Sequence, residues 1–490
     1  MIKTSLKLIL HIFLPVTLCI ILTGSVVPAF AQTAPENLSE KVDTYINETM
    51  RRLPIPGLAV GIVKGDRVLH LQGYGIANAN GDPVTPQTAF MLASLTKTFT
   101  ALAVYQLAGS GKIDLEYRVQ TYIPEFQLAD EQAATLITVR DLLDHTSGIS
   151  TIEGTQPYLQ STNTTFEEAL NALAQYRIKH SPGTQFEYSN WNYVLLGEVI
   201  TRASGEPYEV FMQKNIFDPL EMSRTTFADH HTIPGAATGN LIVFGVSVPY
   251  NEPYIPVTVS AGHLTSTAED MTHYLTAFFD HGQYHEQSLL HSEGPGWYDT
   301  SWYWHAGTPD DISYGFSGGH NSINTNIQLF PLHKVGVVIL MNTRLDTLIP
   351  GPSTDEIAFN IARIAIDYPY ELPSNRRFYS GYALLDGFLL LMVVRAIWQA
   401  ARLRNWGEYY RSETRLRRIL TWFGIVFDLL VFLVVLVLPL AWSTRWHVVL
   451  HFRPDFAIPL LTIGLCLGAL GLIKCTELTM NTNKHGQNIL

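Results

Sequence analysis

The sequence predicts an α+β fold: an antiparallel sheet flanked by helices, with a mostly helical subdomain, followed by a transmembrane helical segment. Two pairs of apolar, β-branched runs, within residues 58–72 and 323–341, have the alternation and turn residues of hairpins. The region between them, about 95–290, is richer in helical patterns, and three long apolar stretches follow residue 380. A chain of 490 residues has room for one large unit with accessory segments.

The elements follow in order along the chain. We expect a helix near residues 40–52, then paired strands at 58–64 and 67–72 joined by a turn at Gly65 and Asp66. A second strand pair is expected at 323–330 and 335–341, where Pro331 ends the first strand. A late helix near 354–367 and the helix near 40–52 could cover the resulting sheet.

A possible catalytic pair begins the helical region. Ser94 and Lys97 stand three residues apart, so both lie on one face of a helix. A serine hydroxyl needs a neighbouring base to become a nucleophile. Apolar neighbours disfavour an ammonium, so the pKa of Lys97 should fall and a free amine could take the Ser94 proton. The alternative for this tetrapeptide alone is a helix N-terminus with a surface lysine.

Other segments give this pair its setting. Tyr188, Ser189 and Asn190 follow about ninety residues later, although Tyr45 and Asn47 match the same short pattern without such a setting. In chain order, the segments that surround this pair are TVRDLLDHTSG at 138–148, PGTQFEYSNWNYVLLG at 182–197, FDPLEM at 217–222 and AGHLTSTAED at 261–270. Together these segments resemble the serine β-lactamase and penicillin-binding protein superfamily, over roughly residues 38–368. The most similar branch is the class C β-lactamase-like serine hydrolases.

The resemblance implies a β-lactamase/transpeptidase-like fold and a role for each matching residue. Ser94 would be the acylated nucleophile, and Lys97 its base or a proton relay. Tyr188 would pass the proton to the leaving group, provided that cationic Lys97 lowers its pKa. Asn190 would hydrogen-bond the substrate amide. The oxyanion hole would use the backbone N–H groups of Ser94 and Gly319.

The third family element departs from the usual pattern. Related sequences carry Lys-Thr-Gly or His-x-Gly on the strand that faces the nucleophile, whereas here Phe316, Ser317 and Gly318 occupy the corresponding place, followed by Gly319. Phenylalanine neither donates a proton nor attracts a carboxylate, which weakens a β-lactam or D-Ala-D-Ala assignment. His305 offers a rival register, and His320 could compensate from a neighbouring position. We favour the register with Phe316.

The same segment also matches G-x-S-x-G, the nucleophile elbow of α/β-hydrolases, at residues 315–319. That elbow needs a buried strand before the serine and a helix after it. Here a polar loop precedes the serine and a strand-like run follows it. The required order of a later Asp and then a His is also missing, because the histidines after Asp346 are His447, His451 and His485, near or within the predicted membrane segments. We therefore disfavour this alternative.

Both ends of the chain indicate export and membrane anchoring. Residues 1–31 resemble a signal peptide, with Lys3 and Lys7, an apolar core and an Ala-Phe-Ala site, although a retained anchor is the alternative. We expect the hydrolase domain at 32–370, a linker at 371–380, three transmembrane helices within 381–475 and a cytoplasmic tail at 476–490. Six arginines between the first two spans should stay cytoplasmic, at positions 402, 404, 411, 415, 417 and 418. The chain would then be a multi-pass protein of a bacterial cell membrane with its catalytic domain outside.

Two charges fall inside the predicted spans. By helix rise, Asp428 lies about 14 Å from the inner end of its span and Arg395 about 20 Å from the outer end of its own. In a hydrocarbon core about 30 Å thick these depths nearly coincide. We predict a buried pair that links the two helices. The alternative is two independent charges that snorkel or thin the bilayer.

The charge balance and the cysteine and histidine content limit which partners and metals we expect. Residues 32–370 hold 17 Lys and Arg against 36 Asp and Glu, which disfavours nucleic acid and most simply serves solubility. That region has no cysteine and hence no disulfide. We expect no metal site, because His281 and His285 lack an accompanying carboxylate pattern, and no cofactor. The expected partners are a small-molecule or peptide substrate, possibly of cell-wall origin, and the lipid bilayer.

The sequence therefore predicts a membrane-tethered, extracytoplasmic serine hydrolase that forms an acyl-enzyme. Its substrate could be a peptidoglycan or D-amino-acid peptide, a β-lactam or a small ester. A sensor with little turnover is one alternative, motivated by Phe316, although a loop of about 17 residues between spans leaves no room for a signalling domain. A cell-envelope protein that keeps the fold without activity is another.

Overall fold

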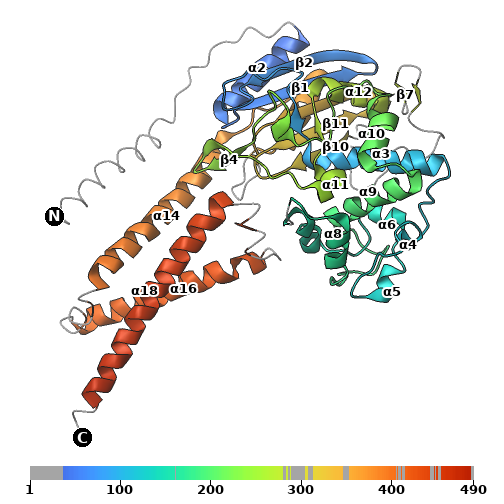
Figure 1. Ribbon diagram of the computed structural model, residues 1–490. Helices are drawn as coiled ribbons and strands as arrows, with labels where there is room; N and C mark the ends of the chain where they lie inside the picture. Colours follow the sequence, from blue (N-terminus) through green and yellow to red (C-terminus); the bar gives the residue numbers. More distant parts are fainter. Residues whose placement is uncertain are drawn as a thin grey trace.

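The computed structural model describes residues 37–159, 162–279, 283–284, 287–288, 304–306, 313–345, 352–403, 406, 410, 414–441, 446, 449–450 and 454–486. Figure 1 shows an α+β unit built around one sheet, with three long helices extending from one side of it. The predicted order of hairpin, helical region, hairpin and long C-terminal helices is confirmed. His281 and His285 lie outside the described residues.

The main sheet has six antiparallel strands in the order β2-β1-β12-β11-β10-β9. Both predicted hairpins are present, as β1–β2 and β11–β12, and they join because β1 pairs with β12, with Val60 opposite Ile339. Gly65 has φ +59° in the first turn, a conformation that favours glycine. The strands are β1 Gly57–Lys64, β2 Arg67–Gly75, β9 Trp304–Ala306, β10 Ser313–Gly319, β11 Asn324–Phe330 and β12 Val335–Met341.

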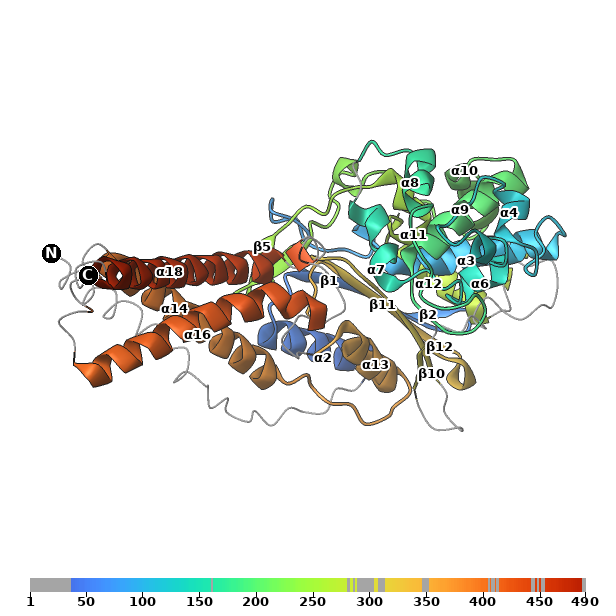
Figure 2. The same cartoon turned by 90° about the horizontal axis from the view of Figure 1, so that it is seen from below.

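Helices cover both faces of this sheet (Figure 2). One face is covered by α2 (Leu38–Arg52) and α13 (Thr354–Ala365), which share a hydrophobic core with Leu58, Val60 and Ile62 of β1. α12 (Ala268–Phe279) packs on the other face. Because side chains alternate along a strand, β1 buries both of its faces, which explains its nearly continuous apolar sequence. The predicted covering helices are confirmed, with α2 starting two residues earlier and α13 ending two residues sooner.

The helical region beside the sheet holds most of the remaining elements. α3 (Thr96–Gly109) and α9 (Asn190–Ser204) pack against each other and against the short helix α11 (Val259–Gly262). The other short helices are α4 Val119–Tyr122, α5 Glu131–Ala134, α6 Val139–Leu143, α7 Thr151–Gly154, α8 Phe166–Leu173 and α10 Tyr208–Met212. Three two-stranded sheets complete the unit: β3 Phe90–Met91 with β6 Thr265–Ser266, β4 Asn240–Val243 with β5 Val246–Pro249, and β7 Gln283–Tyr284 with β8 Gln287–Ser288.

Three C-terminal helices are long and apolar enough to cross a membrane: α14 Asn375–Leu403, α16 Arg415–Ala441 and α18 Pro454–Gly486. The β4–β5 hairpin meets the start of α14, where a Cβ on Gly245 would lie 3.7 Å from the Tyr382 ring. Because α14 begins at Asn375, the second part of the predicted 371–380 linker is helical instead. Helix continues through this stretch because Phe378 and Tyr382 are buried against the α+β unit.

The predicted charge pair between the first two of these helices is present. The Nε of Arg395 donates to Oδ1 of Asp428 over 2.6 Å, and Nη2 of the same guanidinium donates to the Gly424 carbonyl over 2.8 Å. Gln399 adds a donor to Oδ2 of Asp428 over 2.7 Å and accepts from Lys474 of α18. One buried carboxylate therefore organises polar contacts among all three helices.

Candidate active site

Ser94 lies in a tight 3₁₀ turn, Ala93–Leu95, directly before α3. Ala93 has φ +48°, an unusual conformation for a residue with a Cβ. The turn is held in place by its surroundings: the Leu92 N–H donates to the Leu264 carbonyl over 2.7 Å, and the Thr96 hydroxyl donates to the Ala93 carbonyl over 2.6 Å. Strained backbone held in this way is common at catalytic sites.

Lys97 is one helical turn further on, and its side chain is fully buried. Its Nζ lies 3.1 Å from the Ser94 Oγ and donates to the Ala261 carbonyl over 2.5 Å. Burial lowers the pKa of Lys97 well below its usual value, because the buried amine loses its hydration. The structure therefore places an amine whose neutral form is favoured by burial within hydrogen-bond distance of the serine hydroxyl, as the spacing predicted.

Tyr188 completes a cluster of three side chains. Its hydroxyl lies 2.9 Å from the Ser94 Oγ, and Lys97 Nζ sits 5.2 Å from the centroid of its ring. Burial raises the pKa of Tyr188 to about 12, while the hydrogen bond with Ser94 opposes that shift. The expectation that a Lys97 charge lowers the tyrosine pKa is wrong, because the same burial that neutralises the lysine also disfavours a phenolate. Burial therefore favours the neutral form of both groups, and the protonated phenol can act as a proton donor.

His145 holds the Tyr188 segment in place, a positioning role that the sequence reading missed. Its Nδ1 accepts from the Ser189 N–H over 3.1 Å and from the Asn192 amide over 3.0 Å. The Ser147 hydroxyl donates to the other end of that amide over 2.7 Å, which orients its NH₂ group toward the imidazole. The ring packs on Tyr188 with centroids 4.5 Å apart. Burial lowers the pKa of His145 well below its usual value, so it remains a neutral acceptor.

Asn190 begins α9, directly after the residues that His145 holds. Its Oδ1 is buried and has no hydrogen-bond partner among the described residues. A buried amide oxygen without a partner is costly, so an unused acceptor beside a nucleophile is suited to a substrate N–H. This placement agrees with the role that the family resemblance implies for Asn190.

Strand β10 lies directly against the nucleophile turn, which brings Ser317, Gly318 and Gly319 to the site. A Cβ on Gly318 would lie 2.1 Å from the Leu92 carbonyl oxygen and 2.9 Å from the Leu95 nitrogen, so only glycine allows this approach. The Thr325 hydroxyl of the next strand donates to the same Leu92 carbonyl over 2.8 Å.

The structure separates the three candidates for the third family element. Phe316 is on β10 but is only 5% exposed and packs within the hydrophobic core. His305 is one strand further out, on β9 opposite Tyr314. His320 follows β10, with its Nδ1 3.9 Å from Oε2 of Glu252. Of the three, only Phe316 lies on the strand that packs against the turn of Ser94, which supports the register with Phe316.

Arg344 was not among the residues singled out from the sequence. A Cβ on Gly319 would lie 3.4 Å from its Cζ, so the guanidinium is next to the glycine pair at the end of β10. Arg344 follows Asn342 and Thr343 just beyond β12. Because it is far from Phe316 in the sequence, its approach to the end of β10 could not be predicted from local spacing. A guanidinium is well suited to a substrate carboxylate.

A buried carboxylate lies under this end of the site. Glu252 is 2% exposed and accepts from both the N–H and the hydroxyl of Ser322, over 2.7 and 2.8 Å. Burial raises the pKa of Glu252 to about 7, against the opposing hydrogen bonds from Ser322. The ring of His263 lies 5.4 Å from that of His320, and burial lowers the pKa of His263 to about 3.

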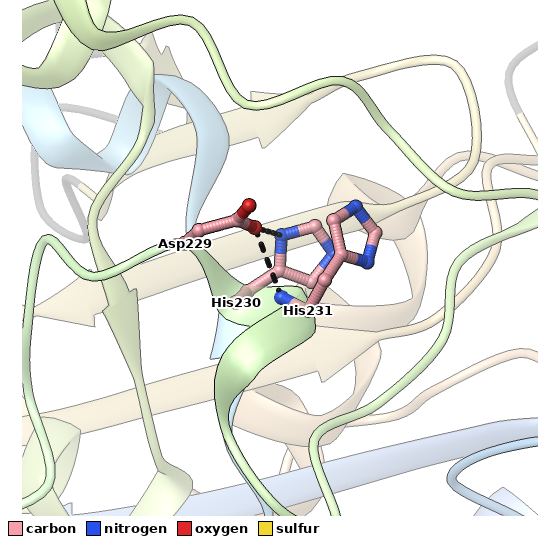
Figure 3. Close-up of side chains that lie close together, drawn as sticks. All are labelled: Asp229, His230 and His231. Carbon is pink, nitrogen blue, oxygen red and sulfur yellow. Dashed lines mark hydrogen bonds and ion pairs between the residues drawn. The ribbon is translucent and has the colours of Figure 1, made fainter.

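Asp229, His230 and His231 form a compact group whose possible ligand atoms lie within 4.8 Å of one another (Figure 3). The carboxylate of Asp229 accepts from the His231 N–H over 3.0 Å, and His231 Nε2 hydrogen-bonds to the Glu252 carbonyl over 2.7 Å. Burial lowers the pKa of His230 to about 4. Asp229 therefore caps the short turn that begins at His230, and this turn supports the backbone at Glu252.

The α/β-hydrolase alternative is wrong for the described residues. Ser317 lies inside strand β10, which pairs antiparallel with β11 after a short connection. A nucleophile elbow requires the serine in a turn between a strand and a helix. The hydroxyl of Ser94 instead has the amine of Lys97 and the hydroxyl of Tyr188 within hydrogen-bond distance.

Comparison with known proteins agrees with this geometry. The family model described as beta-lactamase matches residues 42–348. Protein flp of Staphylococcus aureus (strain NCTC 8325 / PS 47) is 26% identical over 452 residues, covering 87% of this chain and 88% of that protein.

Two solved structures are similar to the fold. One is the octameric penicillin-binding protein homologue from Pyrococcus abyssi, with TM-score 0.57 and 25% identity, covering 67% of this chain and 77% of that chain. A class C beta-lactamase has TM-score 0.57 and 19% identity, covering 70% of this chain and 99% of its own. The predicted fold and family are thereby confirmed, and this chain belongs to the beta-lactamase family.

Proposed function

We propose that the chain is a membrane-anchored serine hydrolase that cleaves an amide or ester through an acyl-enzyme on Ser94. The observation that carries this proposal is the contact of the Ser94 hydroxyl with both the buried amine of Lys97 and the buried phenol of Tyr188, at 3.1 and 2.9 Å. The amine accepts the Ser94 proton, so the oxygen can attack a carbonyl carbon. The same two groups also support the return of that proton.

The sequence of proton transfers follows from the pKa directions. Lys97 takes the proton as the C–O bond forms, and the backbone N–H groups of Ser94 and Gly319 are proposed to stabilise the oxyanion. Tyr188 donates its proton to the departing nitrogen or oxygen as the scissile bond breaks, and Lys97 reprotonates the phenol. In deacylation a water molecule loses its proton through the same groups, and Ser94 Oγ regains one. Asn190 is proposed to hold the substrate amide.

The substrate classes remain those expected from the sequence: peptidoglycan or D-amino-acid peptides, β-lactams and small esters. The buried Phe316 argues against the usual third-element contact with a carboxylate. Membrane anchoring is supported by three helices long and apolar enough to span a bilayer. The arginines between the first two of them support an extracytoplasmic hydrolase domain.

Active-site labelling tests the function directly. We expect a fluorophosphonate to add to Ser94 in the full-length protein, seen by intact mass, and the Ser94→Ala variant to show no adduct. A fluorescent penicillin on the same two proteins separates the substrate classes. Labelling by the fluorophosphonate alone favours an esterase or peptidase. Absence of any adduct with both probes contradicts the proposal and favours the non-catalytic alternative.

A penicillin adduct that forms but does not turn over favours the second candidate, a penicillin-binding sensor. The specific observation behind this candidate is Phe316, which replaces the cation expected on β10. Release of the hydrolysed acyl group, followed by mass over time, distinguishes the two. A stable adduct supports the sensor, and its loss with return of free protein supports the hydrolase.

Arg344 is expected to bind a substrate carboxylate in place of the cation that β10 lacks. For Arg344→Gln we expect KM to rise about tenfold for an acidic substrate, because one charge-assisted hydrogen bond is lost, with little change in kcat. For a neutral ester of the same acyl group KM should stay within about twofold. Equal effects on both substrates would show that Arg344 only supports the fold.

A further inference from the structure

A cationic cavity of about 300 Å³ lies among the three C-terminal helices, far from the catalytic serine. Arg395 and Arg402 of α14, Arg417 of α16 and Lys474 of α18 all line it. None of the described residues that line it is acidic. The cavity extends from the polar network around Asp428 to the ends of α14 and α16 that the arginine-rich loop connects.

The described polar network beside this cavity centres on one carboxylate, that of Asp428. The two carboxylate oxygens of Asp428 accept from Arg395 and from the neutral amide of Gln399, over 2.6 and 2.7 Å. Lys474 is only 4% exposed and donates to the amide oxygen of Gln399, with its Nζ 4.9 Å from the centroid of the Trp406 ring. One carboxylate therefore serves two deep cations, and two further arginines line the same cavity. Charged groups at membrane depth require counter-charge or water.

The walls of the cavity include apolar side chains that face outward from the helices. Leu420 of α16 is 60% exposed and Trp398 of α14 is 49% exposed, and both line the cavity. In a membrane, such surfaces contact acyl chains. The cavity therefore combines a cationic interior with an opening that an amphipathic molecule could enter from the side.

We propose that this cavity binds the phosphate headgroup of an anionic glycerophospholipid, with its acyl chains along the surface of α16 at Leu420. Arginine forks match phosphate oxygens well, and Arg402 and Arg417 lie at the interfacial ends of their helices. Basic pockets between transmembrane helices on the cytoplasmic side suit such headgroups. A phosphate bound there would place negative charge among the four cations that line the cavity. This proposal is independent of the chemistry at Ser94.

Lipid titration of the purified full-length protein in detergent, read by native mass spectrometry, tests the site. We expect phosphatidylglycerol to be retained at least tenfold more strongly than phosphatidylcholine of the same chains. Arg417→Gln should weaken retention of phosphatidylglycerol about fivefold, because one surface cation near an anionic lipid contributes roughly that factor. The double variant Arg402→Gln/Arg417→Gln should weaken it about twentyfold.

Arg415→Gln is the matched control, since Arg415 is on the first turn of the same helix but does not line the cavity. It should stay within twofold of the unmodified protein, and Ser94 labelling should be unchanged in every variant, which shows that each has folded. The proposal is overturned if Arg415→Gln and Arg417→Gln weaken binding equally, or if phosphatidylcholine binds as well. It is also overturned if inorganic phosphate alone, at the same concentration, displaces phosphatidylglycerol, because the ligand is then a free anion.

Discussion

Replacing Lys97 by methionine is expected to slow acylation of Ser94 by about a thousandfold, the central range for loss of a positioned general base. The amine lies 3.1 Å from the Ser94 Oγ, and among the described residues only Tyr188 also hydrogen-bonds to that oxygen. Tyr188 is a poor substitute, because its pKa of about 12 keeps it protonated. Stopped-flow labelling with a fluorophosphonate measures the rate constant. Lys112→Met, an exposed lysine just after the same helix, is the control and should leave the rate unchanged.

The pH dependence follows from the lowered pKa of Lys97. The amine is neutral above its own pKa, so acylation should rise with pH through that lowered value and remain flat across neutral pH. Lys97→Met should remove this acidic limb. Lys97→Arg should be as slow as Lys97→Met at neutral pH, because a guanidinium stays protonated. A rate limb near the usual lysine pKa would contradict the assignment of a neutral amine.

The same shift affects stability with a definite sign. Between the lowered pKa of folded Lys97 and its ordinary value, the unfolded chain binds more protons than the folded chain does. Stability therefore rises with pH in this window, and the buried lysine destabilises the fold at neutral pH. We accordingly expect the Tm of Lys97→Met to equal or exceed that of the unmodified protein, so that lost activity cannot be attributed to unfolding.

Asp428→Ala is expected to destabilise the bundle of three C-terminal helices by about 3–5 kcal/mol, the range for removing one partner of a buried ion pair. The substitution leaves Arg395 without its carboxylate, and it also removes the acceptor of Gln399. Thermal unfolding in nanodiscs, followed by the fluorescence of the tryptophans in this region, measures the loss. Ser94 labelling reports separately on the α+β unit, which should remain folded.

The double variant Arg395→Leu/Asp428→Leu is the informative comparison. Replacing both charges by apolar groups removes the uncompensated cation, so much of the stability lost in Asp428→Ala should return. Asp386→Ala, which removes a carboxylate of α14 outside the network, serves as a control and should cost far less. If Asp428→Ala and Asp386→Ala destabilise the bundle equally, Arg395 and Asp428 act as independent charges, which was the alternative stated from the sequence.

Local patterns in the sequence were sufficient for much of the fold. The alternation in residues 58–72 and 323–341 depends only on neighbours within a strand, so it predicted both hairpins and their turns. The three-residue spacing of Ser94 and Lys97 sets one helical face without any distant contact. Helix rise alone placed Arg395 and Asp428 at similar depths, and the structure pairs them at 2.6 Å.

Contacts between distant segments were needed for the rest. Whether Phe316, His305 or His320 faces the nucleophile depends on how β10 meets the turn before Ser94, and the decisive contact joins Gly318 to the Leu92 carbonyl. The approach of Arg344 to Gly319 likewise depends on the ordering of strands in the sheet. His145 gained a role only because the Ser189 N–H and the Asn192 amide converge on its Nδ1.

The sequence by itself thus determined the elements and the family, and it predicted the nucleophile and its base, because these depend on short spacings within single helices and strands. Only the tertiary structure showed the burial of Lys97 and Tyr188, the contact of β10 with the turn of Ser94 and the cationic cavity between the three C-terminal helices. Each of these depends on segments remote in the chain, and removal from water is what shifts the pKa of a buried group.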